Sequence, residues 1–173
     1  MFLSLQVVDL PRSLPARMRF VVLLIFIYAP FVSVAQLQGK VVAIADGDTF
    51  TMLVDNKQIK IRLHGIDCPE KKQDFGNVAK EYVSGLVFGK VVEVRKMNKD
   101  RYGRTVGIAT VNGLNVNEAL LKAGLAWHYK EYDTNPAWAH LEETARKEKK
   151  GLWVQPNAIP PWQFRKRKKP ARQ

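Results

Sequence analysis

Short apolar runs separated by turn residues dominate the chain after residue 36. Residues 40–45 form a compact β-branched run, and residues 50–55 and 58–64 flank Asn56-Lys57, a pair typical of a hairpin turn. In the second arm, isoleucine and leucine alternate with lysine, arginine and histidine. One face of that strand is therefore apolar and the other is cationic.

Three stretches show helical spacing. The first covers residues 77–89, the second covers 115–124 and begins with a capping box, and the third covers 135–151 and begins with Asn-Pro. The residues that we expect to face inward are Val78, Tyr82, Val83 and Leu86 in the first helix, and Trp138, Leu141 and Ala145 in the third.

Strand periodicity returns between the helices. Residues 90–96 and 104–111 read as strands, and Asn112-Gly113 follows the second of them as a hairpin turn. About five strands with three interspersed helices predict a small α+β domain. Because the strands are short and rich in turns, a closed or partly closed antiparallel barrel suits them best.

The chain is strongly basic for its size. Its 173 residues suit one domain with short appendages, and its formal net charge is +12. Such an excess favours a polyanionic partner, either nucleic acid or an anionic membrane surface.

The N-terminus reads as an export signal. Residues 20–32 form an almost uninterrupted apolar run, two arginines precede it, and Ser-Val-Ala at 33–35 follows. The run is short for a membrane-spanning helix, and Pro30 argues against one. We therefore expect residues 1–35 to be a signal peptide, with a secreted or periplasmic product. An uncleaved anchor is the alternative.

The C-terminus is expected to be a basic, flexible tail. It spans residues 156–173 and contains Arg-Lys-Arg-Lys-Lys at 165–169, a block of like charge that repels itself. Binding of this block to anionic lipid is one alternative function for the chain, as a membrane-tethered envelope protein.

Any metal site in this chain must be built mainly from oxygen ligands. The single cysteine, Cys68, cannot form an internal disulfide or a cysteine-based zinc site, and the three histidines show no ligand spacing. Asp48 and Asp67 lie on either side of the first hairpin, and a barrel can bring them together as ligands for a hard divalent cation.

Two further residue types suit phosphodiester hydrolysis. Glu70 lies close to Asp67 in sequence and is a candidate base for a metal-bound water. Arg62 and Arg104 offer planar, permanently charged forks for phosphoryl oxygens. Each feature alone has an ordinary explanation, such as a turn or a surface charge.

Several motifs occur in an order that resembles the staphylococcal (micrococcal, thermonuclease) nuclease family. They are Asp-Gly-Asp-Thr at 46–49, Ile-Arg-Leu at 61–63, Gly-Ile-Asp-Cys-Pro-Glu at 65–70, Asp-Arg-Tyr-Gly-Arg at 100–104, Val-Asn-Glu-Ala-Leu at 116–120 and Gly-Leu-Ala at 124–126. The resemblance spans about residues 39–153. It implies a five-stranded OB-fold barrel with three helices at residues 36–155, and Ca²⁺-dependent endonuclease activity on DNA and RNA that leaves 3′-phosphate ends.

The resemblance also implies a role for each site residue. Asp48 and Asp67 match the calcium carboxylates, Cys68 matches a backbone-carbonyl ligand, and Asp46 matches a carboxylate in the outer surroundings of the metal. Glu70 matches the general base, whereas Arg62 and Arg104 match the phosphate-binding arginines. Tyr102 and Tyr132 match positions that line the nucleotide pocket. The loop between Glu70 and Gly76 is shorter than in the founding member of the family.

The leading hypothesis is therefore an exported, monomeric nuclease without stable membrane association. The principal alternative is an OB module that binds nucleic acid without cutting it, since barrels of this type also bind strands non-catalytically.

Export predicts a defined mature N-terminus. Mass spectrometry of the processed protein should find Gln36 as the first residue, whether translation begins at Met1 or Met18. The mature chain would keep 25 basic and 15 acidic residues, a net charge of +10. A mature chain that retains the apolar run of residues 20–32 would instead support an anchor.

Overall fold

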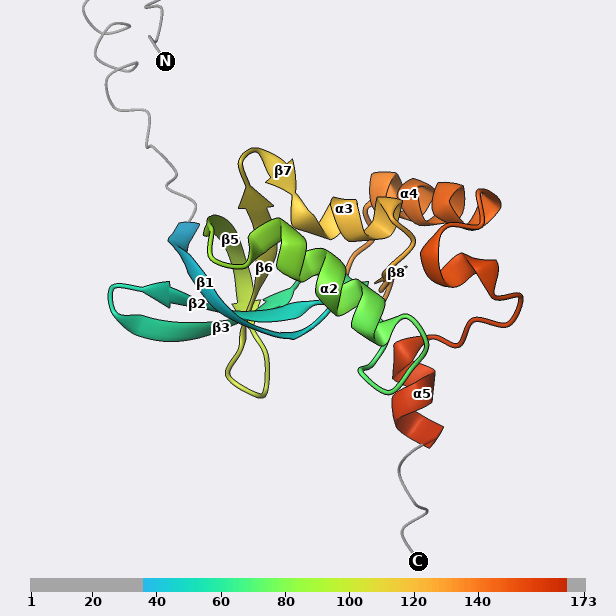
Figure 1. The fold of residues 1–173 in the computed structure, drawn as a ribbon, viewed down its shortest axis with the longest axis horizontal. Coiled ribbons are helices and arrows are strands. Elements are labelled where there is room, and N and C mark those ends of the chain that lie inside the picture. Colours follow the sequence, from blue (N-terminus) through green and yellow to red (C-terminus); the bar gives the residue numbers. More distant parts are fainter. Residues whose placement is uncertain (1–35, 168–173) are drawn as a thin grey trace, which may run out of the picture. The chain divides into compact units, whose positions relative to one another are not determined.

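The computed structural model describes residues 36–167, and the predicted signal peptide at 1–35 lies outside this range. The strands are β1 (Gln36–Asp46), β2 (Thr49–Val54), β3 (Lys57–Leu63), β4 (Ile66–Asp67), β5 (Val91–Lys99), β6 (Thr105–Val111), β7 (Leu114–Asn115) and β8 (Trp127–His128). The helices are α2 (Gly76–Val87), α3 (Val116–Lys122), α4 (Pro136–Lys147), the 3₁₀ helix η1 (Gly151–Val154) and α5 (Pro161–Arg167) (Figure 1). Within residues 36–167, none of these helices combines the length and apolarity needed to span a membrane.

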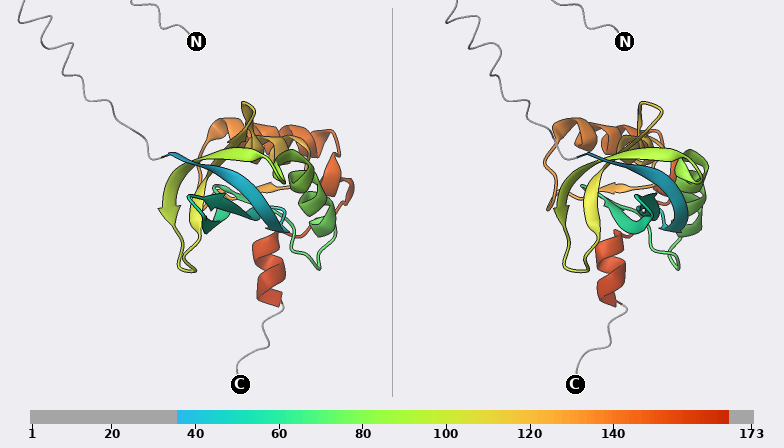
Figure 2. Two further views of the ribbon diagram at one scale, coloured as in Figure 1. Left: turned by 60° about the vertical axis from the view of Figure 1, so that its left-hand side comes forward. Right: turned by 90° about the vertical axis from the view of Figure 1, so that its left-hand side faces the viewer.

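Five strands close into a barrel. Neighbours in the order β3-β2-β1-β5-β6 pair antiparallel, and β3 then pairs with β6 in parallel to close the ring. Figure 2 shows these strands curving around a common interior. Register shifts in β1 and β5 support this curvature, because a bulge bends and twists its strand. The predicted α+β fold with a five-stranded OB barrel is thus confirmed.

The first hairpin turn lies one residue earlier than predicted. Asp55 and Asn56 form it, with φ of 47° and 61°, and β3 begins at Lys57. Two consecutive positive φ angles are the signature of the tight hairpin turn that matches strand twist, and Asp and Asn tolerate them. The second predicted turn, Asn112-Gly113, is confirmed with φ of 49° and 79°.

The face predicted for helix α2 is confirmed only in part: Val83 is buried and Leu86 packs against the core. Val78 and Tyr82 are exposed, whereas Ala79, Val83 and Val87 are fully buried. The small Ala79 lets the helix approach β1 closely: a β-carbon on Gly47 would lie 2.8 Å from that of Ala79. Close approach of the backbones therefore decides the helix phase, and hydrophobicity alone does not.

The capping predictions for the other two helices are confirmed. The Asn115 side chain accepts a hydrogen bond from the Glu118 amide and begins α3, and the Asn135 side chain accepts one from the Ala137 amide and begins α4. Helix α4 ends at Lys147, earlier than predicted, and Gly151 instead begins η1.

The expectation of a flexible tail from residue 156 is corrected for residues 161–167. These residues form α5, a fourth α-helix that the sequence did not predict. Pro161 begins it, and the indole of Trp162 stacks on Tyr129 with ring centroids 4.8 Å apart. Aromatic packing near its first turn therefore outweighs the repulsion within the basic block.

Asn117 joins α3 to the barrel. Its fully buried side chain accepts a hydrogen bond from the Ala109 amide and donates one to the His64 carbonyl, at 3.1 and 2.9 Å. The side chain thus satisfies two backbone groups and fixes the end of β3 against β6.

Replacing Asn117 with alanine should destabilise the fold. Each buried backbone group left without a partner costs about 1–3 kcal/mol, so urea denaturation should show a loss of about 2 kcal/mol or more. The matched control is Asn98→Ala on β5, where the side chain is exposed and a change within about 0.5 kcal/mol is expected. Equal stability of the two variants would contradict this role for Asn117.

Candidate active site

The acidic turn between β1 and β2 places Asp48 in a buried position at the end of the barrel. Oδ2 of Asp48 accepts a hydrogen bond from the Cys68 amide at 2.8 Å, and its Oδ1 accepts one from the Thr49 hydroxyl at 3.2 Å. Gly47 is needed at this turn because a β-carbon there would lie 2.9 Å from that of Cys68. Local backbone and side-chain contacts therefore fix the Asp48 carboxylate.

Arg62 joins the two predicted metal carboxylates. It lies on β3 opposite Thr49, so its side chain reaches the same end of the barrel. Its Nη2 donates to Oδ1 of Asp67 at 2.8 Å, and its Nη1 forms an ion pair with Oδ2 of Asp48. The Arg62 side chain is 14% exposed, and the two carboxylates are 7% and 1% exposed. The two terminal nitrogens of one guanidinium therefore contact one acid each, which holds the two carboxylates close together.

Asp46, Asp48 and Asp67 place several negative charges close together around the turn between β1 and β2. Burial, and next the charge of Asp48, raise the pKa of Asp46 to about 7. Burial and Asp48 also raise the pKa of Asp67. Although burial alone would lower the pKa of Arg62, the charges of Asp48 and Asp67 raise it, so this side chain stays cationic.

Glu70 lies at the rim of the same site. Its side chain is 38% exposed and its Oε1 accepts a hydrogen bond from Nη1 of Arg165 at 2.7 Å. The same guanidinium contacts both oxygens of Asp67, at 3.2 and 2.8 Å. Arg165 on α5 thus links Glu70 to the buried acids.

Arg104 reaches the site from the loop before β6. Its Nε donates to Oδ2 of Asp100 at 2.6 Å, and its Nη1 donates to the Thr49 hydroxyl at 3.4 Å. Although burial alone would raise the pKa of Asp100, hydrogen bonds from Arg104 and the Tyr102 amide lower it. Asp100 therefore remains an anion that orients Arg104 toward the residue next to Asp48.

The two predicted pocket tyrosines are both exposed. Tyr102 is 70% exposed, with the guanidinium of Arg104 5.5 Å from its ring centroid. Tyr132 is 62% exposed and meets Tyr129 edge-on at 4.8 Å. The guanidinium of Arg101 also lies over the Tyr102 ring, 5.1 Å from its centroid.

The thiol of Cys68 is unsuited to nucleophilic chemistry. Burial, and next the charge of Asp48, raise the pKa of this thiol well above its usual range, so it remains protonated. The residue contributes its amide hydrogen bond to Asp48, as described above.

The chain also matches known proteins by sequence. A family model described as staphylococcal nuclease homologue matches residues 60–155. A relative from Escherichia coli O157:H7, named an uncharacterized endonuclease, is 41% identical over 151 residues that cover 87% of this chain and 99% of the relative. A micrococcal nuclease from Shigella flexneri is 34% identical over 171 residues that cover 92% of this chain and 98% of the relative.

A plant relative shows the same domain in a longer protein. A staphylococcal-like nuclease from Arabidopsis thaliana is 44% identical over 113 residues, which are 65% of this chain and 35% of the relative. This chain belongs to the staphylococcal nuclease family. The resemblance seen in the sequence motifs is thus confirmed.

The acids of this staphylococcal nuclease domain fit a hard divalent cation. Asp48 and Asp67 both place a carboxylate oxygen on the Arg62 guanidinium, and burial and next the charge of Asp48 raise the pKa of Asp67, a cost that a cation relieves. Among residues 36–167, no three His, Cys, Asp or Glu side chains form a complete metal site. Further ligands would therefore be carbonyl or water oxygens.

Several residues at the site escaped sequence reasoning. Thr49 connects Asp48 to Arg104, and Arg165 pairs with both Asp67 and Glu70. Arg165 lies within the basic block of the tail, and nothing in the sequence distinguishes it from the neighbouring lysines and arginine. The signal that could have found α5 is Pro-Pro-Trp at 160–162, a proline helix start followed by a large aromatic residue.

Removing Arg62 should leave the buried Asp48 without its cationic partner and Asp67 with Arg165 alone. Breaking a buried ion pair by deleting one partner typically costs about 3–5 kcal/mol, so Arg62→Met should lower the free energy of unfolding by that order in urea. Arg95→Met on β5 removes an exposed arginine from the same barrel and should change stability by less than about 0.5 kcal/mol. A stable Arg62→Met protein would show that the acids do not depend on this guanidinium.

Proposed function

We propose that this chain is an exported Ca²⁺-dependent endonuclease that hydrolyses phosphodiester bonds of DNA and RNA to products with 3′-phosphate ends. Membership of the staphylococcal nuclease family and the printed names of its relatives support a nuclease. One structural observation carries the proposal. Two buried acids share a guanidinium at the barrel end, and Glu70 and Arg104 lie around them.

Asp48 and Asp67 would hold the cation, with the Cys68 carbonyl as a further ligand and Asp46 outside the ligand set. Their oxygen chemistry suits Ca²⁺, and the family resemblance favours this ion among the hard cations. When bound, such a cation polarises the phosphate and helps to place the attacking water.

Glu70 would accept the proton of the attacking water. A general base must reach the attacking water, and the position of the partly exposed Glu70 at the rim, linked through Arg165 to Asp67, supports this role. The water oxygen would bond to phosphorus while the bond from phosphorus to the 5′-oxygen breaks. The leaving 5′-oxygen would take up a proton from solvent to become a hydroxyl, and the phosphate would stay on the 3′ side.

Arg62 and Arg104 would bind the phosphoryl oxygens. Negative charge grows on these oxygens in the transition state, and guanidinium groups fixed in advance stabilise it without reorganisation. Asp100 fixes Arg104 in this way through two hydrogen bonds to its backbone and side chain, at 3.0 and 2.6 Å.

The substrate would be bound with little sequence preference. The net charge of +12 supports attraction to the phosphate backbone, which makes affinity strongly dependent on salt. The exposed rings of Tyr102 and Tyr132 would supply stacking surfaces, which tolerate any base. The protein would act as a monomer, released from the membrane after signal cleavage.

Cleavage should require Ca²⁺, Glu70 and Arg104. With single-stranded DNA, activity in Ca²⁺ should disappear in excess chelator, and Glu70→Gln and Arg104→Ala should each reduce the rate on the order of 10²-fold. Mass spectrometry of a cleaved oligonucleotide should find 3′-phosphate and 5′-hydroxyl ends.

Matched controls distinguish the loss of a catalytic group from the mere loss of a charge. Glu81→Gln on α2 and Arg95→Ala on β5 change the same residue types at exposed positions, and near-normal rates are expected. Cleavage that persists in chelator, or in both active-site variants, would contradict the mechanism. Salt-dependent DNA binding without cleavage would favour the non-catalytic OB module.

A further inference from the structure

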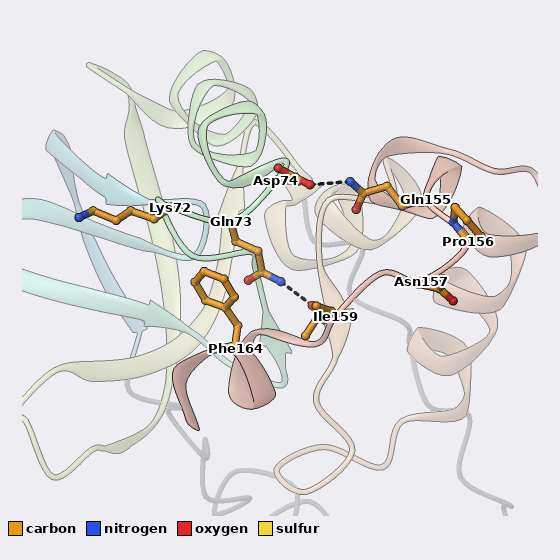
Figure 3. Close-up of a pocket in the computed structure, with 8 residues that line it drawn as sticks. All are labelled: Lys72, Gln73, Asp74, Gln155, Pro156, Asn157, Ile159 and Phe164. Carbon is orange, nitrogen blue, oxygen red and sulfur yellow. Dashed lines mark hydrogen bonds between the residues drawn. The ribbon is translucent and has the colours of Figure 1, made fainter. Parts of the chain in front are cut away.

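The segment after η1, residues 155–160, is hydrogen-bonded to the loop that follows Glu70, residues 71–75. Gln155 donates to Asp74 at 2.8 Å, and the Gln73 side chain donates to the Ile159 carbonyl (Figure 3). Figure 3 also shows Phe164 of α5 lying beside Gln73. These residues line a pocket of about 400 Å³ between the loop and the segment. The short loop after Glu70 thus serves as a docking surface for the C-terminal segment.

An aromatic cluster holds the start of α5. The Trp162 ring stacks on Tyr129 with an interplanar angle of 5°, and it meets Trp127 edge-on at 5.7 Å. Tyr129 and Trp127 flank His128 of β8, the strand that pairs with β4 and therefore with Asp67. The anchor of α5 is consequently attached to the strand pair that carries a predicted metal ligand.

Arg165 extends from this anchor into the acidic site. Its guanidinium donates to both oxygens of Asp67 and to Oε1 of Glu70, within 3.2 Å in each case. Oδ1 of Asp67 also receives Arg62, so both oxygens of this carboxylate have cationic partners from the chain itself. A divalent cation needs the same oxygens at 2.3–2.6 Å or closer, and it is repelled by a guanidinium that holds them.

We propose that α5 is an autoinhibitory strap in which Arg165 competes with the divalent cation for Asp67 and also occupies Glu70. The inference rests on the proposed function for the identity of the cation. Loading of the site requires Arg165 to leave Asp67, and the same movement frees Glu70 to accept a proton.

The test is direct Ca²⁺ binding, measured by isothermal titration calorimetry without nucleic acid. Arg165→Ala should bind Ca²⁺ about tenfold more tightly than the unaltered chain. A larger gain is not expected, because the Arg165 side chain is 43% exposed and solvent screens its charge. Arg167→Ala removes the same charge from an exposed position of the same helix and should change affinity by less than about twofold.

Hydrogen exchange supplies a second readout that does not depend on activity. Saturating Ca²⁺ should speed exchange of the α5 amides in the unaltered chain, because a displaced short helix opens more often.

The outcomes distinguish the strap from the proposed function. Ca²⁺ binding of equal or lower affinity in Arg165→Ala, or unchanged exchange in α5, would overturn the strap and leave the metal assignment intact. Absence of Ca²⁺ binding in all three proteins would contradict the proposed metal and, with it, the competition.

Discussion

The ion pairs of Arg62 with Asp48 and Asp67 hold together three segments that are separate along the chain. Burial of two acids beside each other is unfavourable, as the raised pKa of Asp67 records, and one guanidinium offsets that cost. Because its planar fork presents two nitrogens in a fixed spacing, it also sets how far apart the acids lie. The geometry of the active site therefore depends on a single strand residue.

The barrel supplies the rigidity that this arrangement needs. Closure by the parallel pair of β3 and β6 brings the loop of Arg104 beside the acidic turn, and Asn117 locks the end of β3 from the other side. Close contact of α2 with the turn explains the glycine at 47. Sites on rigid elements hold their side chains more precisely than sites on free loops, which suits charge stabilisation in a transition state.

The C-terminal segment shows how one block of charge can acquire a specific role. In sequence, Arg165 is one of several consecutive cations, and in the structure it is the one that α5 directs at Asp67 and Glu70. If α5 must be displaced before the metal binds, metal binding is coupled to a movement of α5 that hydrogen exchange can detect. Its strength is set by partly exposed ion pairs, which are weaker than the buried pairs of Arg62.

The sequence by itself determined the five barrel strands, the two capped helices and the family, because turn residues, caps and ordered motifs are local signals. It also singled out the acids Asp48 and Asp67 and the arginine Arg62, which the structure brings together at the end of the barrel. Only the tertiary structure decided that Val78 and Tyr82 of α2 stay exposed, since the close approach of Ala79 to Gly47 depends on the turn after β1 rather than on the helix itself. Arg165 and Asp67 are 98 residues apart in the sequence, and their pairing depends on the packing of Trp162 against Tyr129. Contacts of that separation depend on how the whole barrel closes, which no local pattern in the chain encodes.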